Sequence, residues 1–259
     1  MGRGVLDLML AGPEARLDLG GGVAVRSHIS SPEVFLNDAE RRFYMIFHSP
    51  SPIGQISFLA TSASGLNFNR PGEGGERGEG VRPFILSPSP YMRLFYKDGT
   101  AHAVCHSGYF ARPVDPSRPW EIADSLKPAE PSWEVLPRSI FIEEIKSLLG
   151  REDELESGAL ALRHCSLRTS GDGRALEVFF SRAFESPEHI LHAVVDISPK
   201  DWREWRLMGP PAKLLCAEEP WEGECLHDTH VFEDVGGQLY LFYSCREEDA
   251  IAVAKLHAL

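Results

Sequence analysis

The sequence predicts an all-β fold, a β-propeller assembled from repeated antiparallel sheets. A hairpin pattern of an apolar strand, a polar turn and an aromatic-rich strand occurs four times, in residues 31–49, 91–107, 163–181 and 226–244. It recurs roughly every 60 to 75 residues, a longer period than that of the common propeller repeats. Stacking such sheets around an axis buries faces that one sheet alone leaves exposed. A β-sandwich of similar hairpins is the rival fold, and the further strand after three of the hairpins favours the propeller.

The turn chemistry supports each hairpin in order. The turns consist of Asn, Asp and Gly, which tolerate the positive φ angles of tight hairpins. The runs FYMIF, LEVFF and LYLFY that follow three of the turns are typical of packed strands, and AHAVC is a weaker version. The four turns read Asn37-Asp38, Asp98-Gly99, Gly171-Asp172-Gly173 and Gly236-Gly237.

Further strands and one helix complete the expected elements. The segments QISFLATS, HILHAVVDIS and AIAVAKL predict an additional strand in the first, third and fourth units. Apolar side chains at a 3.6-like spacing in residues 137–157 predict one inserted helix. The Gly- and charge-rich segment 69–80 and the Pro-rich segment 112–131 are expected to be irregular connections. A single domain over residues 1–259 thus contains units at about 26–70, 84–135, 158–210 and 223–259.

The composition excludes several classes of partner. A net charge of -12 and a pI near 5.3 disfavour nucleic acid and anionic membranes, because both select a positive surface. No apolar run approaches the roughly 20 residues of a membrane helix. Five cysteines, odd in number and irregular in spacing, predict reduced thiols rather than disulfides or a zinc site. The first residues make a poor signal peptide, so a cytoplasmic location is expected.

Two stretches resemble a known family. SPEVFLND and RRFYMIFH followed by SASGLNF, and HDTHVFEDVGGQLYLFYS followed by AIAVAKL, are similar to blades of the five-bladed propeller glycosidases, glycoside hydrolase family 43 and its relatives. A bacterial group related to that family is more similar still, and the resemblance covers most of residues 26–259. It implies five blades, of which four are visible. The remaining blade would precede His28, where residues 1–25 could supply only an outermost strand.

The resemblance implies a glycoside hydrolase-like protein that binds, and as an inverting enzyme hydrolyses, a small saccharide in the central funnel. The alternative is a non-catalytic propeller that binds a ligand or protein partner after losing the catalytic acids. Inverting hydrolysis needs two carboxyl groups about 6.5 to 9.5 Å apart. Among the blade starts only Asp228 keeps the expected acid, and Glu33 is its candidate partner. Alternatively, Asp228 only stabilises a turn, and strand alternation turns Glu33 to the other face.

Polar residues at the starts of the inner strands are the candidates for substrate binding, because these starts converge on the funnel of a propeller. Each has a structural alternative, a histidine bonded to a backbone carbonyl or an arginine paired with an acid. Imidazole and carboxylate groups here also suit a divalent metal, but no spacing fixes a geometry, and no cofactor is expected. The candidates are His28, Tyr91, Arg93, Arg163, His164, His227 and His230, with Trp221 just ahead of the last inner strand.

Overall fold

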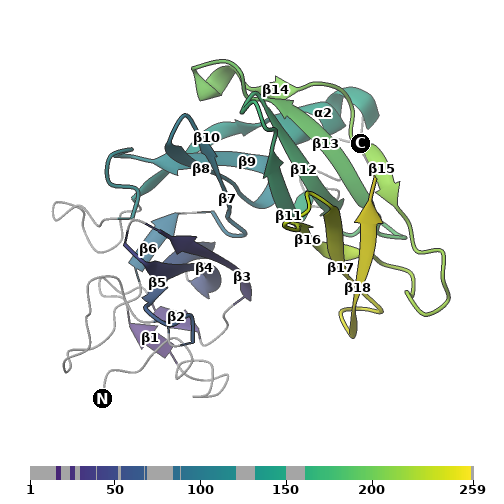
Figure 1. The fold of residues 1–259 in the computed structure, drawn as a ribbon, viewed down its shortest axis with the longest axis horizontal. Coiled ribbons are helices and arrows are strands. Elements are labelled where there is room, and N and C mark those ends of the chain that lie inside the picture. The colour runs from purple at the N-terminus through teal and green to yellow at the C-terminus, as the bar shows by residue number, and fades with distance from the viewer. Residues whose placement is uncertain are drawn as a thin grey trace. The chain divides into compact units, whose positions relative to one another are not determined.

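The computed structural model describes residues 16–18, 24–26, 30–38, 40–51, 54–66, 68, 84–87, 89–120, 132–149 and 161–257. Their strands form four sheets of three to five strands and a two-stranded ribbon (Figure 1). Within these residues α2 (Ile140–Leu149) is the one α-helix, inside the segment predicted to be helical. The all-β prediction is therefore confirmed. By its contacts the chain divides into two compact units, Met1–Met92 with Ala111–Val135 and Arg93–Phe110 with Leu136–Leu259.

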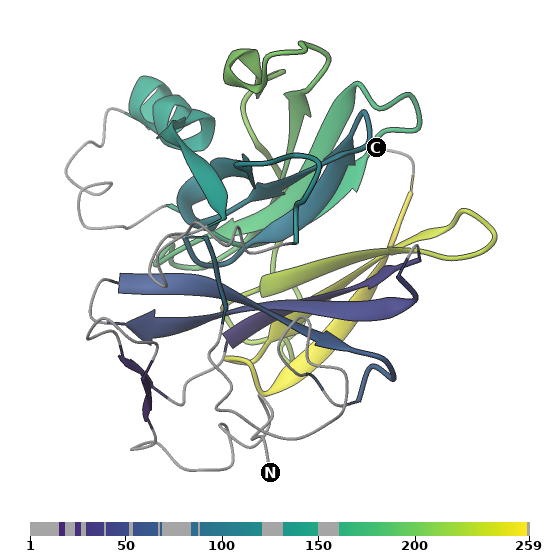
Figure 2. The same cartoon turned by 90° about the vertical axis from the view of Figure 1, so that its left-hand side faces the viewer.

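The first unit is built on the sheet β3-β4-β5-β6 (Figure 2). Phe47, Ile56 and Phe58 form its core, and the predicted first hairpin is confirmed by the antiparallel pairing of β3 with β4. Residues 1–25, which were expected to supply an outermost strand of a blade, contain β1, which pairs with β2 as a separate ribbon. The strands are β1 (Arg16–Asp18), β2 (Ala24–Arg26), β3 (Ser30–Asn37), β4 (Arg42–Ser51), β5 (Gly54–Ser62) and β6 (Phe84–Ser87).

The next sheet has the order β10-β9-β8-β7, and the boundary between the two units runs within it. Its first hairpin turns at Asp98-Gly99, as predicted. The short helix η1 (His106–Gly108) joins β8 to β9. Gly108 has a φ of +74°, and a Cβ there would lie 2.5 Å from the ring of Phe141, so only glycine fits where α2 packs on this turn. The strands are β7 (Arg93–Lys97), β8 (Thr100–Val104), β9 (Tyr109–Pro113) and β10 (Trp133–Ser139).

The second unit contains two further sheets whose facing side chains pack together. Leu241, Tyr243 and Leu256 of the last sheet are buried against Phe179 and Ile190 of the preceding one. This core holds β11 beside β16 (Figure 1). The elements are β11 (Leu162–Thr169), β12 (Ala175–Arg182), β13 (Ile190–Asp196), η2 (Trp202–Glu204), β14 (Arg206–Leu207), β15 (Ala212–Leu215), β16 (His227–Glu233), β17 (Leu239–Cys245) and β18 (Ala250–Leu256).

A bulge recurs at the start of three first strands. The register shifts between Ser30 and Glu33 in β3, between Leu162 and Cys165 in β11, and between His227 and His230 in β16. An extra residue at a bulge bends the strand and re-aims the side chains on it. Ser31 and Asp228 occupy the same bulge position, with positive φ angles of 48° and 51°. Local backbone geometry therefore sets these side chains apart from the regular alternation of their strands.

All five cysteines are free thiols, and Cys105, Cys165 and Cys245 are buried. No helix among the described residues is long and apolar enough to cross a membrane.

Candidate functional site

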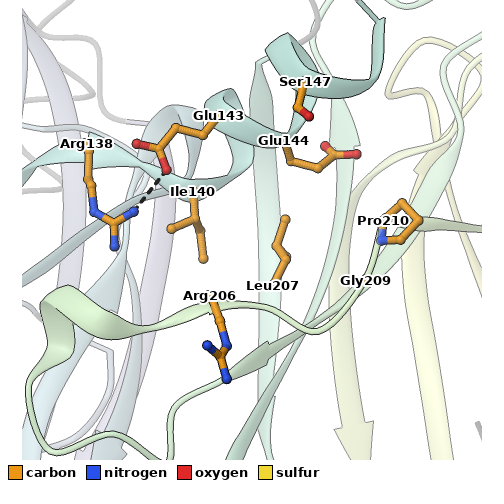
Figure 3. Close-up of a pocket in the computed structure, with 9 residues that line it drawn as sticks. All are labelled: Arg138, Ile140, Glu143, Glu144, Ser147, Arg206, Leu207, Gly209 and Pro210. Atoms are coloured by element: carbon orange, nitrogen blue, oxygen red, sulfur yellow. Dashed lines mark hydrogen bonds and ion pairs between the residues drawn. The ribbon is translucent and has the colours of Figure 1, made fainter.

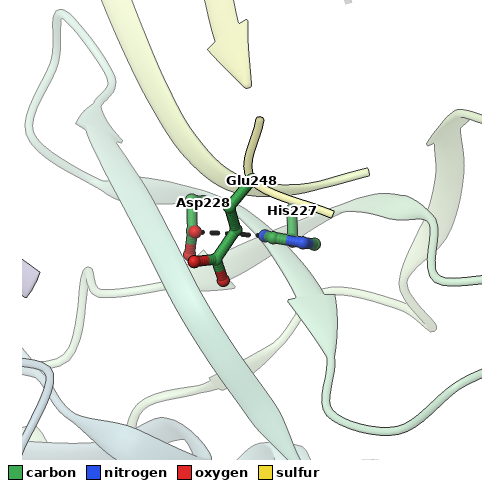
Figure 4. A group of neighbouring side chains, drawn as sticks. All are labelled: His227, Asp228 and Glu248. Atoms are coloured by element: carbon green, nitrogen blue, oxygen red, sulfur yellow. Dashed lines mark hydrogen bonds and ion pairs between the residues drawn. The ribbon is translucent and has the colours of Figure 1, made fainter. Parts of the chain in front are cut away.

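Asp228 lies between two imidazole rings. Oδ1 of its carboxylate is 2.9 Å from Nδ1 of His164. Oδ2 is 3.0 Å from Nδ1 of His227 (Figure 4). His164 comes from the bulge of β11 and Asp228 from the bulge of β16, so the two bulges bring together residues far apart in the sequence. The side chain of Asp228 is 27% exposed, against 14% for His164 and 6% for His227. The side chain of Asp228 is thus partly open to a solute, although its Oδ1 atom is buried.

The electrostatics of this centre favour an ionised carboxylate. Burial alone would raise the pKa of Asp228, but hydrogen bonds from His164 and His227 and the charge of these imidazoles outweigh it and lower the pKa. The hydrogen bond to Asp228 in turn raises the pKa of His227, against the opposing effect of burial. At neutral pH Asp228 is therefore ionised, so it can accept a hydrogen bond but has no proton to donate.

Arg163 extends the centre and connects it to two further carboxylates. Its guanidinium lies 3.8 Å from Glu188 and 3.5 Å from Glu248. Glu188 is buried and accepts a hydrogen bond from Ser181 at 2.8 Å. Glu248 is exposed and belongs to the turn between β17 and β18. The positive charge of Arg163 is therefore shared between two acids, and the centre as a whole combines three carboxylates with one guanidinium and two imidazoles.

Three of these side chains also form a possible metal-binding set. One ligand atom each from His227, Asp228 and Glu248 lies within 4.8 Å of the others (Figure 4). A nitrogen and two carboxylate oxygens suit several divalent cations.

The turn that carries Glu248 is strained and firmly anchored. Arg246, Glu247 and Glu248 have φ angles of 52°, 54° and 74°, in the left-handed region that costs side-chain-bearing residues energy. The backbone N–H of Arg246 donates to the carbonyl of Glu222 at 2.7 Å. This bond ties the turn to the loop that carries Trp221, whose side chain is 51% exposed.

Residues of η1 and β7 lie beside β11, the strand that carries Arg163 and His164. Burial, and then electrostatic interactions with His164 and Arg163, lower the pKa of His106. The Oγ atom of Ser107 lies 2.8 Å from Nδ1 of His106. Nε of Arg93 donates to the backbone carbonyl of Cys165 at 3.1 Å, so Arg93 braces the start of β11.

The predicted site residues divide by unit. Arg93, Arg163, His164, His227 and Asp228 gather at the centre in the second unit, with Trp221 on the loop tied to the turn of Glu248. His230, also in this unit, is exposed two residues beyond the bulge of β16.

In the first unit, the ring of Tyr91 lies 4.1 Å from that of His48. Glu33 follows the bulge of β3 as His230 follows the bulge of β16, opposite Ile46 and Phe242 respectively. His28 lies outside the described residues. Sequence reasoning missed Glu188, Glu248 and His106, which lie in connections between strands and carry no local pattern.

A shallow pocket elsewhere in the second unit lies between α2 and β14 and contains none of the predicted site residues (Figure 3). Arg138 at its wall is paired with Glu143 at 2.9 Å, and Glu144 is paired with Arg182 at 3.5 Å. Arg138, Glu143 and Glu144 of the lining therefore already have ion-pair partners, and we assign no ligand to the pocket.

No family model matches the sequence, and no curated protein matches it. Solved structures do match in fold. An endo-arabinase from Bacteroides thetaiotaomicron VPI-5482 is 14% identical, with a TM-score of 0.52 over 88% of this chain and 75% of that one. An alpha-L-arabinofuranosidase from Lactobacillus brevis is 12% identical, with a TM-score of 0.55 over 93% and 76%. A thermostable family-43 glycoside hydrolase is 15% identical, with a TM-score of 0.50 over 89% and 72%.

At these identities the likeness shows the fold. The chain has the β-propeller fold of these glycosidases, with its four larger sheets as the blades. The sequence prediction of a propeller of this type is thereby confirmed.

Proposed function

We propose that this chain is a glycoside hydrolase-like protein that binds a small saccharide at Asp228 and acts on its glycosidic bond. The observation that carries the proposal is a partly exposed carboxylate that lies between two histidines at the starts of β11 and β16. The propeller fold shared with glycosidases supports it. Because two of the similar structures are an endo-arabinase and an alpha-L-arabinofuranosidase, arabinose-containing saccharides are the first substrates to test.

In this proposal Asp228 accepts a hydrogen bond from the attacking water or from a sugar hydroxyl. Its lowered pKa makes it a poor general acid, so hydrolysis requires a second carboxyl group that is protonated. Glu33 is the partner that the sequence suggests. A carboxylate oxygen of Glu248 lies within 4.8 Å of a carboxylate oxygen of Asp228, closer than the about 6.5 to 9.5 Å of an inverting pair. We therefore assign Glu248 to ligand binding rather than to proton donation.

The remaining side chains supply sugar contacts in this proposal. Trp221 offers an exposed indole on which the apolar face of a sugar ring can stack. His164 and Arg163 are placed to hydrogen-bond hydroxyl groups. Since Arg163 already faces Glu188 and Glu248, it is better suited to a neutral polyol than to a carboxylate.

Two alternatives have specific support. Both oxygens of Asp228 already face an imidazole, which favours a protein that binds a saccharide without cleaving it. The set of His227, Asp228 and Glu248 favours a metal-dependent hydrolase, in which a divalent ion would polarise a bound water or hydroxyl.

A screen with aryl arabinosides, xylosides and galactosides, combined with calorimetry on arabino-oligosaccharides, tests the proposal. Asp228→Asn is the variant, and Asp249→Asn, an exposed Asp in the neighbouring turn, is the matched control. We expect turnover that Asp228→Asn lowers by about a hundredfold or more while Asp249→Asn leaves it unchanged.

Binding without turnover that Asp228→Asn abolishes would favour the non-catalytic alternative. Turnover that a chelator abolishes and a divalent ion restores would favour the metal-dependent one. Absence of any saccharide binding would refute the proposal.

A further inference from the structure

Two buried hydroxyl groups lie beside the bulge that carries Asp228. Thr229 of β16 and Ser166 of β11 are each only 5% exposed. The backbone N–H of Val231 donates to Oγ of Ser166 at 3.1 Å. The hydroxyl of Ser166 donates to Oγ1 of Thr229 at 3.4 Å, and the hydroxyl of Thr229 donates to the carbonyl of Phe179 at 2.8 Å. A chain of three hydrogen bonds therefore ties β16 to both β11 and β12.

The pairing of β16 with β17 does not fix this bulge by itself. The register skips from His227 to His230, so neither Asp228 nor Thr229 is paired with a residue of β17. Asp228 also has a φ of 51°, in a left-handed region that persists only where surrounding contacts impose it. Among the described strands, β16 is the first of its sheet and pairs with β17 alone. The contacts that fix the bulge must therefore come from the other edge of β16, where Ser166 lies.

The two histidine contacts of Asp228 differ in what holds them. His227 is the adjacent residue of the same strand, so its contact with Oδ2 survives a movement of β16 as a whole. His164 lies on β11, so its 2.9 Å contact with Oδ1 depends on how β11 and β16 lie relative to each other. Ser166 follows His164 closely in β11, and its hydroxyl bonds β16. The hydrogen-bond chain thus spans the same two strands as the contact between His164 and Asp228.

We propose that Ser166 and Thr229 are positioning residues, which hold the carboxylate of Asp228 against His164. They act through the backbone of β16 and not by touching a ligand, because both are buried. A hydroxyl has a single proton to donate, so each one in this chain is committed to one acceptor and keeps one orientation. As a statement about ligand binding the inference rests on the proposed function, but the geometry of the free protein can be measured without any ligand.

NMR of the histidine side chains, recorded on the free full-length protein at one fixed pH, tests this positioning. Ser166→Ala removes the acceptor of the N–H of Val231, and Thr229→Val removes the donor to β12 while keeping the shape of the side chain. In both variants the signal of His164 should move, because its Nδ1 atom loses the contact with Asp228. The signal of His227 should stay, and Thr229→Ser, which keeps the hydroxyl, should retain both wild-type signals.

Ser57→Ala is the matched control for the loss of a buried hydroxyl. The side chain of Ser57 is fully buried in the first unit and donates to the carbonyl of Ser89 at 2.7 Å. This variant should lose a similar amount of stability and leave the histidine signals unchanged. If Ser166→Ala does not fold, Thr229→Val, in which Ser166 can still accept from the backbone of β16, decides the test alone.

Calorimetry with an arabino-oligosaccharide separates this inference from the proposed function. Ser166→Ala and Thr229→Val should weaken binding about tenfold, and Thr229→Ser and Ser57→Ala should leave it unchanged. A wild-type protein that binds no saccharide would refute the proposed function, and the NMR result would still decide the positioning. A His164 signal that stays in place in the folded variants overturns the inference. Equal movement of the His164 and His227 signals, or equal movement in Ser57→Ala, also overturns it, because it would show a general loosening of the fold.

Discussion

Replacing Glu222 with alanine should destabilise the protein by about 3–5 kcal/mol. Glu222 is 4% exposed, and its carboxylate accepts three hydrogen bonds. The donors are the hydroxyl of Tyr243 at 2.7 Å and the backbone N–H groups of Glu218 and Glu219 at 3.0 and 2.9 Å. Each buried donor left without a partner costs about 1–3 kcal/mol, and water can replace part of the loss. Glu222→Gln keeps the acceptor for the two N–H groups and should cost only about 1 kcal/mol.

The stabilisation that Glu222 provides should decrease as the pH falls. Burial would raise the pKa of Glu222, but the hydrogen bonds from Glu219, Tyr243 and Glu218 outweigh it and lower the pKa below 4.5. A carboxyl group whose pKa is lowered on folding stabilises the fold above its unfolded pKa and loses that contribution as the pH falls. Urea unfolding at pH 7 and at several values below 4.5 should show the gap between wild type and Glu222→Gln shrinking. A Glu222→Ala variant within about 1 kcal/mol of wild type at pH 7 would refute the reasoning.

Further predictions concern the turn at η1, the support of β16 and the thiols. Gly108→Ala should cost about 2 kcal/mol in urea unfolding, since its Cβ would lie 2.5 Å from Phe141 at a φ of +74°; an unchanged midpoint would contradict this. Thr229→Val should cost about 1 kcal/mol, because the buried hydroxyl donates to a backbone carbonyl at 2.8 Å. A thiol reagent should react with Cys216 and Cys225 first in the native protein, and with the other three cysteines only on unfolding. Equal reaction rates at all five cysteines would contradict the burial of those three thiols.

The hairpins could be predicted because their signals are local. Turns such as Asp98-Gly99 and Gly236-Gly237 lie between runs of alternating or aromatic residues, and the structure places a turn at each. The segments predicted to continue the units are β5, β13 and β18. The helix was expected from residue 137, but α2 begins at Ile140, because β10 runs up to Ser139. Tertiary pairing, not propensity, decides that boundary.

The candidate site could be predicted only in part. The acid at a strand start pointed to Asp228, and the Arg163-His164 pair pointed to the start of β11. The contact between His164 and Asp228 depends on two bulges and on the packing of β11 beside β16. No local sequence pattern encodes these features. Glu188 and Glu248 come close to Arg163 from loops, where acidic residues are common and carry no signal of their own.

Binding of a saccharide at Asp228 is measured most directly through the two imidazoles beside it. NMR of the histidine side chains, with His164 and His227 assigned from His164→Gln and His227→Gln variants, would follow a titration with an arabino-oligosaccharide. Ligand contact with the carboxylate must disturb both of its partners, so both signals should shift with one saturable affinity, and Asp228→Asn should abolish the shifts. Saturable binding that leaves the signals of His164 and His227 unmoved would contradict a saccharide site at Asp228.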